Sequence, residues 1–195
     1  MLDIGTSEAR DRVLDTAQRL FSERGYTAVT LRDIARELGM RQASLYYHAP
    51  RGKEELFVLA TERSLARHKQ GMEAAIANAG PDLRAQIKAA AHWLLSQPPM
   101  DWSRMMRTDM PAIAPEHAAR LTKAAYEALL QPVATSLAHS EYAASLTVAQ
   151  MNVFPGTFVA AISALPDLEY LTPVAKEELA DQIVDMLLDG IRPRS

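Results

Sequence analysis

Residues 30–56, TLRDIARELGMRQASLYYHAPRGKEEL, hold two short helical patterns on either side of a single glycine, Gly39. The second pattern, residues 42–48, has Leu45 as its only clear apolar anchor and ends in three polar rings. A helix this short is not stable alone in water. The stretch therefore predicts a helix that is held by its neighbours and that presents its polar side to another surface.

Local signals place the ends of these helices. Thr30 and Asp33 have the spacing of a capping box, and Gly39 is typical of a left-handed helix cap. An earlier helix is expected over residues 7–24, ended by Gly25, and its apolar stripe has the i, i+4, i+7, i+8 spacing of one buried face. The stripe consists of Val13, Ala17, Leu20 and Phe21. Pro50-Arg51-Gly52 then interrupts the chain.

Helical periodicity continues to the end of the 195 residues, without convincing strand alternation. We predict an all-α fold of about nine helices, in which a three-helix helix-turn-helix domain over 1–52 precedes a larger helical domain over 53–195. Pro132 should kink one helix, and Thr172-Pro173 should begin the last one. The further expected helices are 53–79, 81–97, 101–110, 115–140, 147–165 and 173–190.

Composition excludes several kinds of site. The chain has no cysteine, and its five histidines show no metal-ligand spacing, so we expect no metal and no cofactor. The polar N-terminus does not resemble a signal peptide, which favours a cytoplasmic protein. Residues 1–70 carry twelve Lys/Arg and ten Asp/Glu, a net of +2, whereas the remaining 125 carry nine and fourteen, a net of −5. An anionic partner should therefore meet the first third.

Residues 142–166 carry no formal charge and are long enough to suggest a membrane span. Polar residues interrupt the segment, however, and its longest unbroken apolar run is only Phe158 to Ile162. We predict no membrane contact. A helix buried between its own domain and a second copy of the chain explains the composition better.

Two helices joined by a short turn, here GMRQ, form a helix-turn-helix. In this motif the first helix crosses the DNA backbone while the second enters the major groove, whose width admits one helix. Residues 42–48 are short and polar enough for that second position. Tyrosine hydroxyls and a histidine can donate to phosphate oxygens, so double-stranded DNA is the expected partner.

The run ERGY…TLRDIARELG…ASLYYH…GKEEL resembles the DNA-binding domain of the TetR family of bacterial transcription regulators, over about residues 8–60. The resemblance implies an all-helical homodimer that binds a palindromic operator. It also implies a C-terminal domain that binds a small effector and releases the DNA, as in a repressor. A DNA-binding protein without any effector, or an activator, stays open as an alternative.

The resemblance also assigns residues. It implies phosphate contacts by Thr30 and Arg32, base reading by Arg41, Gln42, Ala43 and Ser44, and backbone contacts by Tyr46, Tyr47 and His48. Lys53 matches a lysine that meets a phosphate at a helix N-terminus. The chain departs from the family pattern at Ala49, and the loop APRG looks one residue long. Arg51 could therefore share or take over the role of Lys53.

The remaining predictions concern the larger domain. Large, adaptable side chains suit an apolar or amphipathic effector, and the candidates are Trp93, Trp102, Met105, Met106, Met110, Tyr126, Met151 and Phe154. Apolar stripes on the last two helices predict a dimer interface formed by Phe158, Val159, Ile162, Leu179, Ile183, Met186 and Leu187. No phosphate loop, nucleophile elbow or zinc motif is present, so catalysis is not expected.

Overall fold

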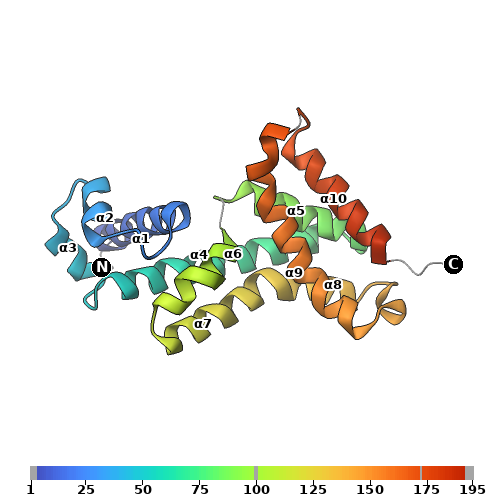
Figure 1. Ribbon diagram of the computed structural model, residues 1–195, viewed down its shortest axis with the longest axis horizontal. Helices are drawn as coiled ribbons and strands as arrows, with labels where there is room; N and C mark the ends of the chain where they lie inside the picture. The colour runs from blue at the N-terminus through green and yellow to red at the C-terminus, as the bar shows by residue number, and fades with distance from the viewer. Residues whose placement is uncertain (1–3, 99–100, 172, 192–195) are drawn as a thin grey trace. The chain divides into compact units, whose positions relative to one another are not determined.

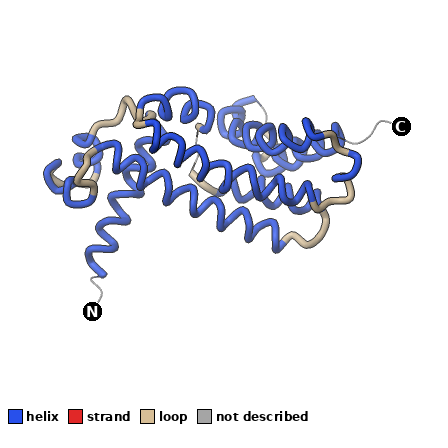
Figure 2. Tube along the Cα trace, turned by 90° about the horizontal axis from the view of Figure 1, so that it is seen from below, coloured by secondary structure: helices blue, strands red, loops and turns tan. Residues whose placement is uncertain are grey.

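The computed structural model describes residues 4–98, 101–171 and 173–191, and these residues form helices and loops without any strand (Figures 1 and 2). The chain divides into two compact units. The first unit comprises Met1–Ser64 with Met100–Thr122, and the second comprises Leu65–Pro99 with Lys123–Ser195. The all-α fold is therefore confirmed. The predicted domain boundary between residues 52 and 53 stays a prediction, since the division into compact units falls inside α4.

The first unit begins with the helices of the predicted helix-turn-helix. They are α1 (Ile4–Arg24), α2 (Leu31–Glu37), α3 (Gln42–His48) and the first part of α4 (Lys53–Asn78). Gly25 and Gly39 adopt φ of 84° and 66°, and both sides of the Thr30–Asp33 capping box form. The predicted end of α1 at Gly25 and the predicted start of α2 after Thr30 are thus confirmed.

A later part of the chain completes the first unit. It contains α6 (Trp102–Arg104), a π-helix (Met105–Asp109), a 3-10 turn (Met110–Ala112) and most of α7 (Pro115–Ala125). Met105, Met110, Ile113 and Leu121 are buried in the same hydrophobic core as the predicted stripe of α1. At the centre of this core the ring of Phe57 lies 5.1 Å from that of Phe21 and 4.9 Å from that of Tyr26. Such aromatic contacts add to the free energy gained by burial.

The second unit is built around α5. It contains the rest of α4, α5 (Leu83–Ser96), a π-helix (Tyr126–Leu130), α8 (Gln131–Ala138), a 3-10 turn (Ala143–Ser145), α9 (Val148–Ala164), a 3-10 helix (Leu165–Leu171) and α10 (Lys176–Ile191). Helix α5 packs against α8, α9 and α10. Ile87, Ala90 and Ala91 of α5 are buried completely, and small alanines allow the close approach of neighbouring helices.

Two helix starts and the passage past Pro132 differ from the prediction. Asp82 caps α5 through the amide of Ala85, so α5 starts at Leu83. The chain passes Pro132 by widening into the π-helix before it, where Gln131 N–H donates to the carbonyl of Tyr126. This wider turn accommodates a proline that has no N–H of its own. Helix α10 begins at Lys176, not at Pro173, because the carbonyl of Ala175 accepts its first hydrogen bond.

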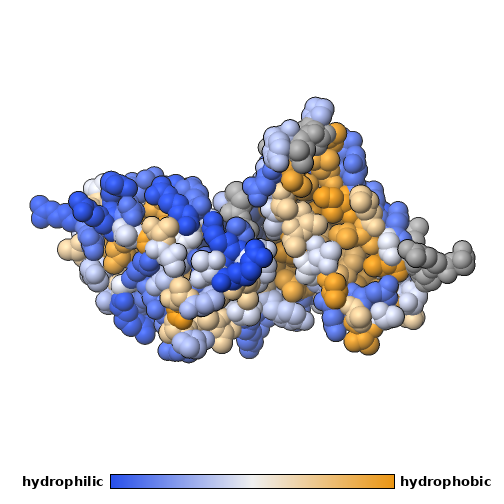
Figure 3. Space-filling model, in the orientation of Figure 1, coloured by the Kyte–Doolittle hydropathy of each residue, from blue (hydrophilic) through white to orange (hydrophobic). Residues whose placement is uncertain are grey.

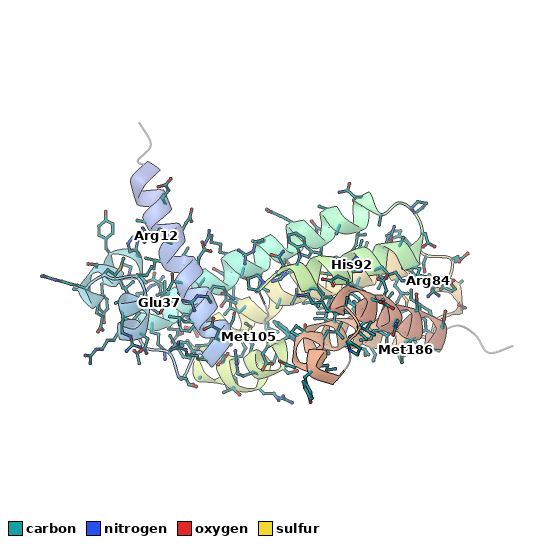
Figure 4. The ribbon with its side chains drawn as sticks, turned by 90° about the horizontal axis from the view of Figure 1, so that it is seen from above. Arg12, Glu37, Arg84, His92, Met105 and Met186 are labelled. Carbon is teal, nitrogen blue, oxygen red and sulfur yellow. The ribbon has the colours of Figure 1, made fainter. Side chains whose placement is uncertain are left out.

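Oppositely charged side chains line the contact between α5 and α10. Arg84, Lys88 and His92 recur every four residues on α5, opposite Asp181, Asp185 and Asp189 on α10 (Figure 4 labels Arg84 and His92). Lys88 Nζ lies 3.1 Å from Asp185, and His92 Nε2 lies 2.9 Å from Asp181. Hydrogen bonds from Arg84 and then Lys88 lower the pKa of Asp185. Exposed pairs add little stability each, but the matched spacing fixes how α10 lies on α5.

Among the described residues, one segment, Val148–Leu168, is long and apolar enough to cross a membrane by length and composition alone. Only 33% of its most apolar window is buried inside the chain. Phe154, Phe158 and Ile162 point into the core of the second unit, whereas Val148 and Val153 are exposed. The apolar surface of α9 is therefore larger than its own unit covers.

Candidate nucleic-acid interface

The turn between α2 and α3 is fixed by backbone hydrogen bonds. Met40 N–H donates to the carbonyl of Ala35 and Gly39 N–H to that of Arg36, which together form a Schellman motif. Only a residue that tolerates positive φ fits at position 39. Arg41 then adopts an extended conformation and α3 begins at Gln42. The turn sets the angle at which α3 leaves α2.

Helix α3 is held on one side and exposed on the other. Leu45 is almost completely buried against the first unit's core, as predicted for its single anchor. Arg41, Gln42, Ala43 and Ser44 are all exposed. Four consecutive exposed residues at a helix N-terminus form a surface that can enter a groove. A contact of these residues with DNA bases stays a prediction.

The aromatic residues at the end of α3 also lie at the surface. Tyr47 is 78% exposed and Tyr46 is 46% exposed. The ring of Tyr47 meets that of His48 edge-on, with centroids 5.6 Å apart. An exposed tyrosine ring adds little to the hydrophobic stabilisation of the fold. Its hydroxyl is accessible from solvent, as donation to a phosphate would require. Neither Tyr47 nor Gln42 points into the core, and a DNA contact by either residue stays a prediction.

The start of α2 is more constrained than the sequence suggests. The hydroxyl of Thr30 accepts from Asp33 N and donates to the Asp33 carboxylate at 2.6 Å. These bonds from the side chain and backbone of Thr30 lower the pKa of Asp33. Thr30 must therefore share its hydroxyl between the cap and any phosphate. Arg32 is exposed and free of this constraint.

Lys53 and Arg51 differ in how they are held. Lys53 Nζ donates to the carbonyl of Tyr26 at 2.7 Å and lies 4.1 Å from the centre of its ring. Burial of this ammonium lowers the pKa of Lys53. The side chain of Arg51 is 79% exposed and pairs with Glu55. Arg51 is thus the more accessible cation before α4, whereas Lys53 stabilises the loop between α1 and α2.

Asp109 and Arg104 hold this loop from the other side, through contacts that the sequence did not predict. Asp109 is buried and accepts from Tyr26 N–H at 2.8 Å. Burial raises the pKa of Asp109, and the bond from Tyr26 partly offsets that effect. Arg104 donates to the carbonyls of Phe21, Ser22 and Glu23 at the end of α1. No sequence signal could reveal contacts between residues about 80 positions apart.

Four predicted effector residues belong to the first unit. Met105 and Met110 are buried in its core, and Trp102 and Met106 pack against that core. Trp93, Tyr126, Met151 and Phe154 belong to the second unit, where Phe154 is buried and Tyr126 is 53% exposed. The first four thus fill an ordinary core in this structure. Effector contact by any of the eight stays a prediction.

Two buried polar atoms in the second unit have no hydrogen-bond partner among the described residues. They are Nδ1 of His68 on α4 and Nε1 of Trp93 on α5. A Cβ added at Gly71 would lie 1.9 Å from the indole, so Trp93 lies directly over that glycine. His68 and Gly71 are three residues apart and share a helix face. Burial, and secondarily the charge of Arg67, lowers the pKa of His68 to about 4, which keeps its imidazole neutral at pH 7.

The predicted dimer residues have unequal exposure. Phe158, Val159 and Ile162 are buried within the chain itself. Leu179, Ile183 and Leu187 are half-buried, and Met186 is strongly exposed. Four other large apolar or aromatic side chains are exposed but were not predicted at the interface, namely Val148, Val153, Leu168 and Tyr170. Val148 and Val153 lie on α9, which is so apolar that its sequence does not separate exposed from buried positions.

Comparison with known proteins agrees with the geometry of the first unit. Residues 13–60 match the sequence model of the family described as bacterial regulatory proteins, tetR family. Over 53 residues the chain is 43% identical to the biofilm operon icaADBC HTH-type negative transcriptional regulator IcaR of Staphylococcus epidermidis. This match covers 27% of the chain and 28% of IcaR.

Solved structures resemble nearly the whole chain. A protein from Saccharomonospora viridis in complex with choline has a TM-score of 0.71 at 25% identity, over 96% of this chain and 100% of that one. AibR, in complex with isovaleryl coenzyme A and operator DNA, has a TM-score of 0.70 at 17% identity, over 91% and 96%. At the lower identity the likeness concerns the fold alone. The resemblance to the tetR family and its helical fold is confirmed.

The buried His68 predicts how stability depends on pH. The pKa of His68 is about 4 in the folded chain, below the ordinary value of 6.5. As the pH falls, this imidazole is therefore protonated in the unfolded chain before it is protonated in the folded one. Stability should fall by about 3 kcal/mol as the pH drops from 6.5 to 4, and His68 should add no further loss below that. His68→Gln should remove this part of the pH dependence in denaturant titrations. The same change at the exposed His139 should leave it intact, and equal profiles for both variants would contradict the assignment.

Proposed function

We propose that this chain, a tetR-family protein by its N-terminal domain, is a cytoplasmic regulator of transcription that binds an operator as a homodimer. The observation that carries the proposal is the position of α3. Leu45 anchors it while Gln42, Tyr46 and Tyr47 face outward. Its relatives include a negative regulator, which supports repression over activation. The match to such relatives spans only 28% of their length, so activity, effector and assembly are proposals.

We assign base reading to the start of α3 and phosphate binding to its surroundings. Gln42 can pair bidentately with adenine, and Arg41 suits guanine. The hydroxyl of Tyr47 and the guanidinium of Arg51 are exposed and can meet phosphates. Phosphate contacts position the protein and base contacts give specificity. Two-fold symmetry would place a second α3 about one helical turn along the duplex.

Gln42→Ala should reduce discrimination at one base pair by roughly 1–3 kcal/mol, because the bidentate contact is lost. Bound fragments selected from genomic DNA would define the inverted repeat, and titrations on its single-base variants would measure the loss. Arg51→Ala is the matched control. It should weaken binding to all variants alike and lower the salt dependence by about one unit of slope. Unchanged relative affinities with Gln42→Ala would contradict base reading.

The dimer is proposed to form through α9 and α10. Figure 3 shows apolar side chains gathered over the face that these helices form. Val148 and Val153 of α9 and Met186 of α10 are exposed, whereas Phe158 and Ile162 of α9 are buried. A second copy of the chain would cover an apolar surface that water otherwise meets. The same contact accounts for the charge-free helix without a membrane.

Met186→Glu should shift the chain from dimer to monomer, because a charge would be buried at the contact. Sedimentation velocity measures the shift, and operator affinity should fall with it, since both half-sites need to be bound together. Gln70→Glu adds the same charge at an exposed position of α4, outside the proposed contact, and should leave the dimer intact. An unchanged dimer with Met186→Glu would place the interface elsewhere.

The effector is proposed to bind in the second unit beside His68 and Trp93. Both carry a buried nitrogen without a hydrogen-bond partner among the described residues, and Trp93 of α5 packs against Gly71 of α4. A small amphipathic molecule could accept from the indole N–H and bond the neutral imidazole. Relatives of the same fold bind choline or an acyl coenzyme A, which supports a small-molecule role. A DNA-binding protein without an effector is the alternative.

Choline and isovaleryl coenzyme A are suitable first members of a thermal-shift panel that extends to fatty acids. A compound at 100 times its Kd should stabilise the chain by about 2.7 kcal/mol. Trp93→Phe keeps the ring but removes the N–H, so the shift should shrink. Tyr170→Phe removes the hydroxyl of an exposed ring of the same unit, so it is the control and should preserve the shift. A full shift with Trp93→Phe would place the site elsewhere.

A further inference from the structure

A groove of about 200 Å³ lies between the first turns of α4 and α7, inside the first unit (Figure 1). Its lining residues recur at three- and four-residue spacings, so one face of each helix borders it. The lining combines charged side chains with two apolar ones, Val58 and Leu59 of α4. The effector site and the dimer contact proposed above use none of these residues.

The carboxylates of the lining are already held by the chain itself. Glu54 accepts from Ala114 N–H at 3.0 Å and from His117 Nδ1 at 2.6 Å, and these bonds lower the pKa of Glu54. Glu55 accepts from the backbone N–H of Arg51 at 2.7 Å. The side chains of Glu54 and Glu55 are only 31% and 18% exposed. These acceptors therefore fasten the starts of α4 and α7.

The guanidiniums of the lining are more accessible than the carboxylates. The side chain of Arg51 is 79% exposed, and that of Arg120 is 54% exposed. Arg120 Nε lies 2.6 Å from a carboxylate oxygen of Glu62, and its two terminal nitrogens have no partner among the described residues. Two parallel N–H groups of a guanidinium match the two oxygens of a carboxylate. The groove therefore still offers donors with positive charge.

The apolar part and the size of the groove restrict the ligand further. Val58 is buried and Leu59 is half-buried, so their side chains can contact the hydrocarbon part of a ligand. The volume of about 200 Å³ is below the roughly 300–1,000 Å³ of most small-molecule pockets. Only a short chain fits this space. An inorganic anion would leave the apolar side chains without a contact.

We infer that the groove binds a small organic anion, namely a carboxylate on a short apolar chain. The carboxylate accepts from the terminal nitrogens of Arg120, and the hydrocarbon lies against Val58 and Leu59. A cationic ligand would be repelled by the guanidiniums of Arg51 and Arg120, and a neutral one would lack the charge that strengthens the hydrogen bonds. The site belongs to the first unit, whereas the proposed effector site belongs to the second.

Hexanoate is the probe, added to the full chain in the absence of DNA, and hexanol is its neutral match. Methyl NMR spectra should show saturable shifts at Val58 and Leu59, with at least about tenfold higher affinity for hexanoate than for hexanol. Arg120→Gln should weaken hexanoate binding at least about tenfold, because the charged donors are lost. Arg120→Lys keeps the charge and should restore part of the affinity.

Arg12→Gln removes the same charge at an exposed position of α1, outside the groove, and should leave the affinity unchanged (Figure 4 labels Arg12). Equal hexanoate affinities for Arg120→Gln and the wild-type chain would overturn the inference, and so would equal binding of hexanoate and hexanol. Shifts confined to methyl groups of the second unit would also overturn it, since the carboxylate would then bind elsewhere.

The test leaves Arg51 unchanged, because that residue is also the proposed phosphate contact. No operator is present in these titrations, and the shifts of Val58 and Leu59 report the groove directly. A failure of this inference is therefore distinguishable from a failure of the proposed function.

Discussion

The surface that we propose reads DNA depends on the burial of a single leucine. Helix α3 has seven residues, too few to be stable alone, and Leu45 is its only buried side chain. The Schellman turn at Gly39 brings α3 to the core, where Ile34 and Ala35 of α2 receive Leu45. Every exposed residue of α3 owes its position to this contact. A short helix with one anchor leaves the remaining faces available for another molecule.

The core that receives Leu45 is itself held by charged groups from distant parts of the chain. Both backbone groups of Tyr26 bond to charged side chains, the carbonyl to Lys53 and the N–H to Asp109. Arg104 binds the last carbonyls of α1, where the helix leaves them unpaired. The π-helix at Met105–Asp109 begins directly after Arg104 and ends at Asp109, so it joins the residue that binds the end of α1 to the residue that binds Tyr26. The first unit therefore includes α6 and most of α7, and a displacement of that segment would reach the loop that leads to α2.

The second unit shows a different balance. Matched charges fix α10 on α5, while α9 supplies apolar surface to the core and to the exterior at once. Val153, Met186 and Tyr170 are all strongly exposed. Inside this unit, the buried Nδ1 of His68 and Nε1 of Trp93 have no hydrogen-bond partner among the described residues. A second copy of the chain would cover the exposed apolar side chains, and a small molecule would bind the two buried nitrogens.

Local chemistry alone determined the helical class, the ends of α1 and α2, and the exposed polar face of α3. Glycine conformations, capping bonds and periodicity act within a few residues, so the sequence displays them directly. Tertiary structure alone decided that Lys53 binds Tyr26, that Met105 and Met110 fill the first unit's core, and that Phe158 and Ile162 are internal. It also placed α10's start at Lys176. Contacts between residues 27 to 105 positions apart depend on how helices pack, and one sequence carries no record of which apolar or charged faces meet.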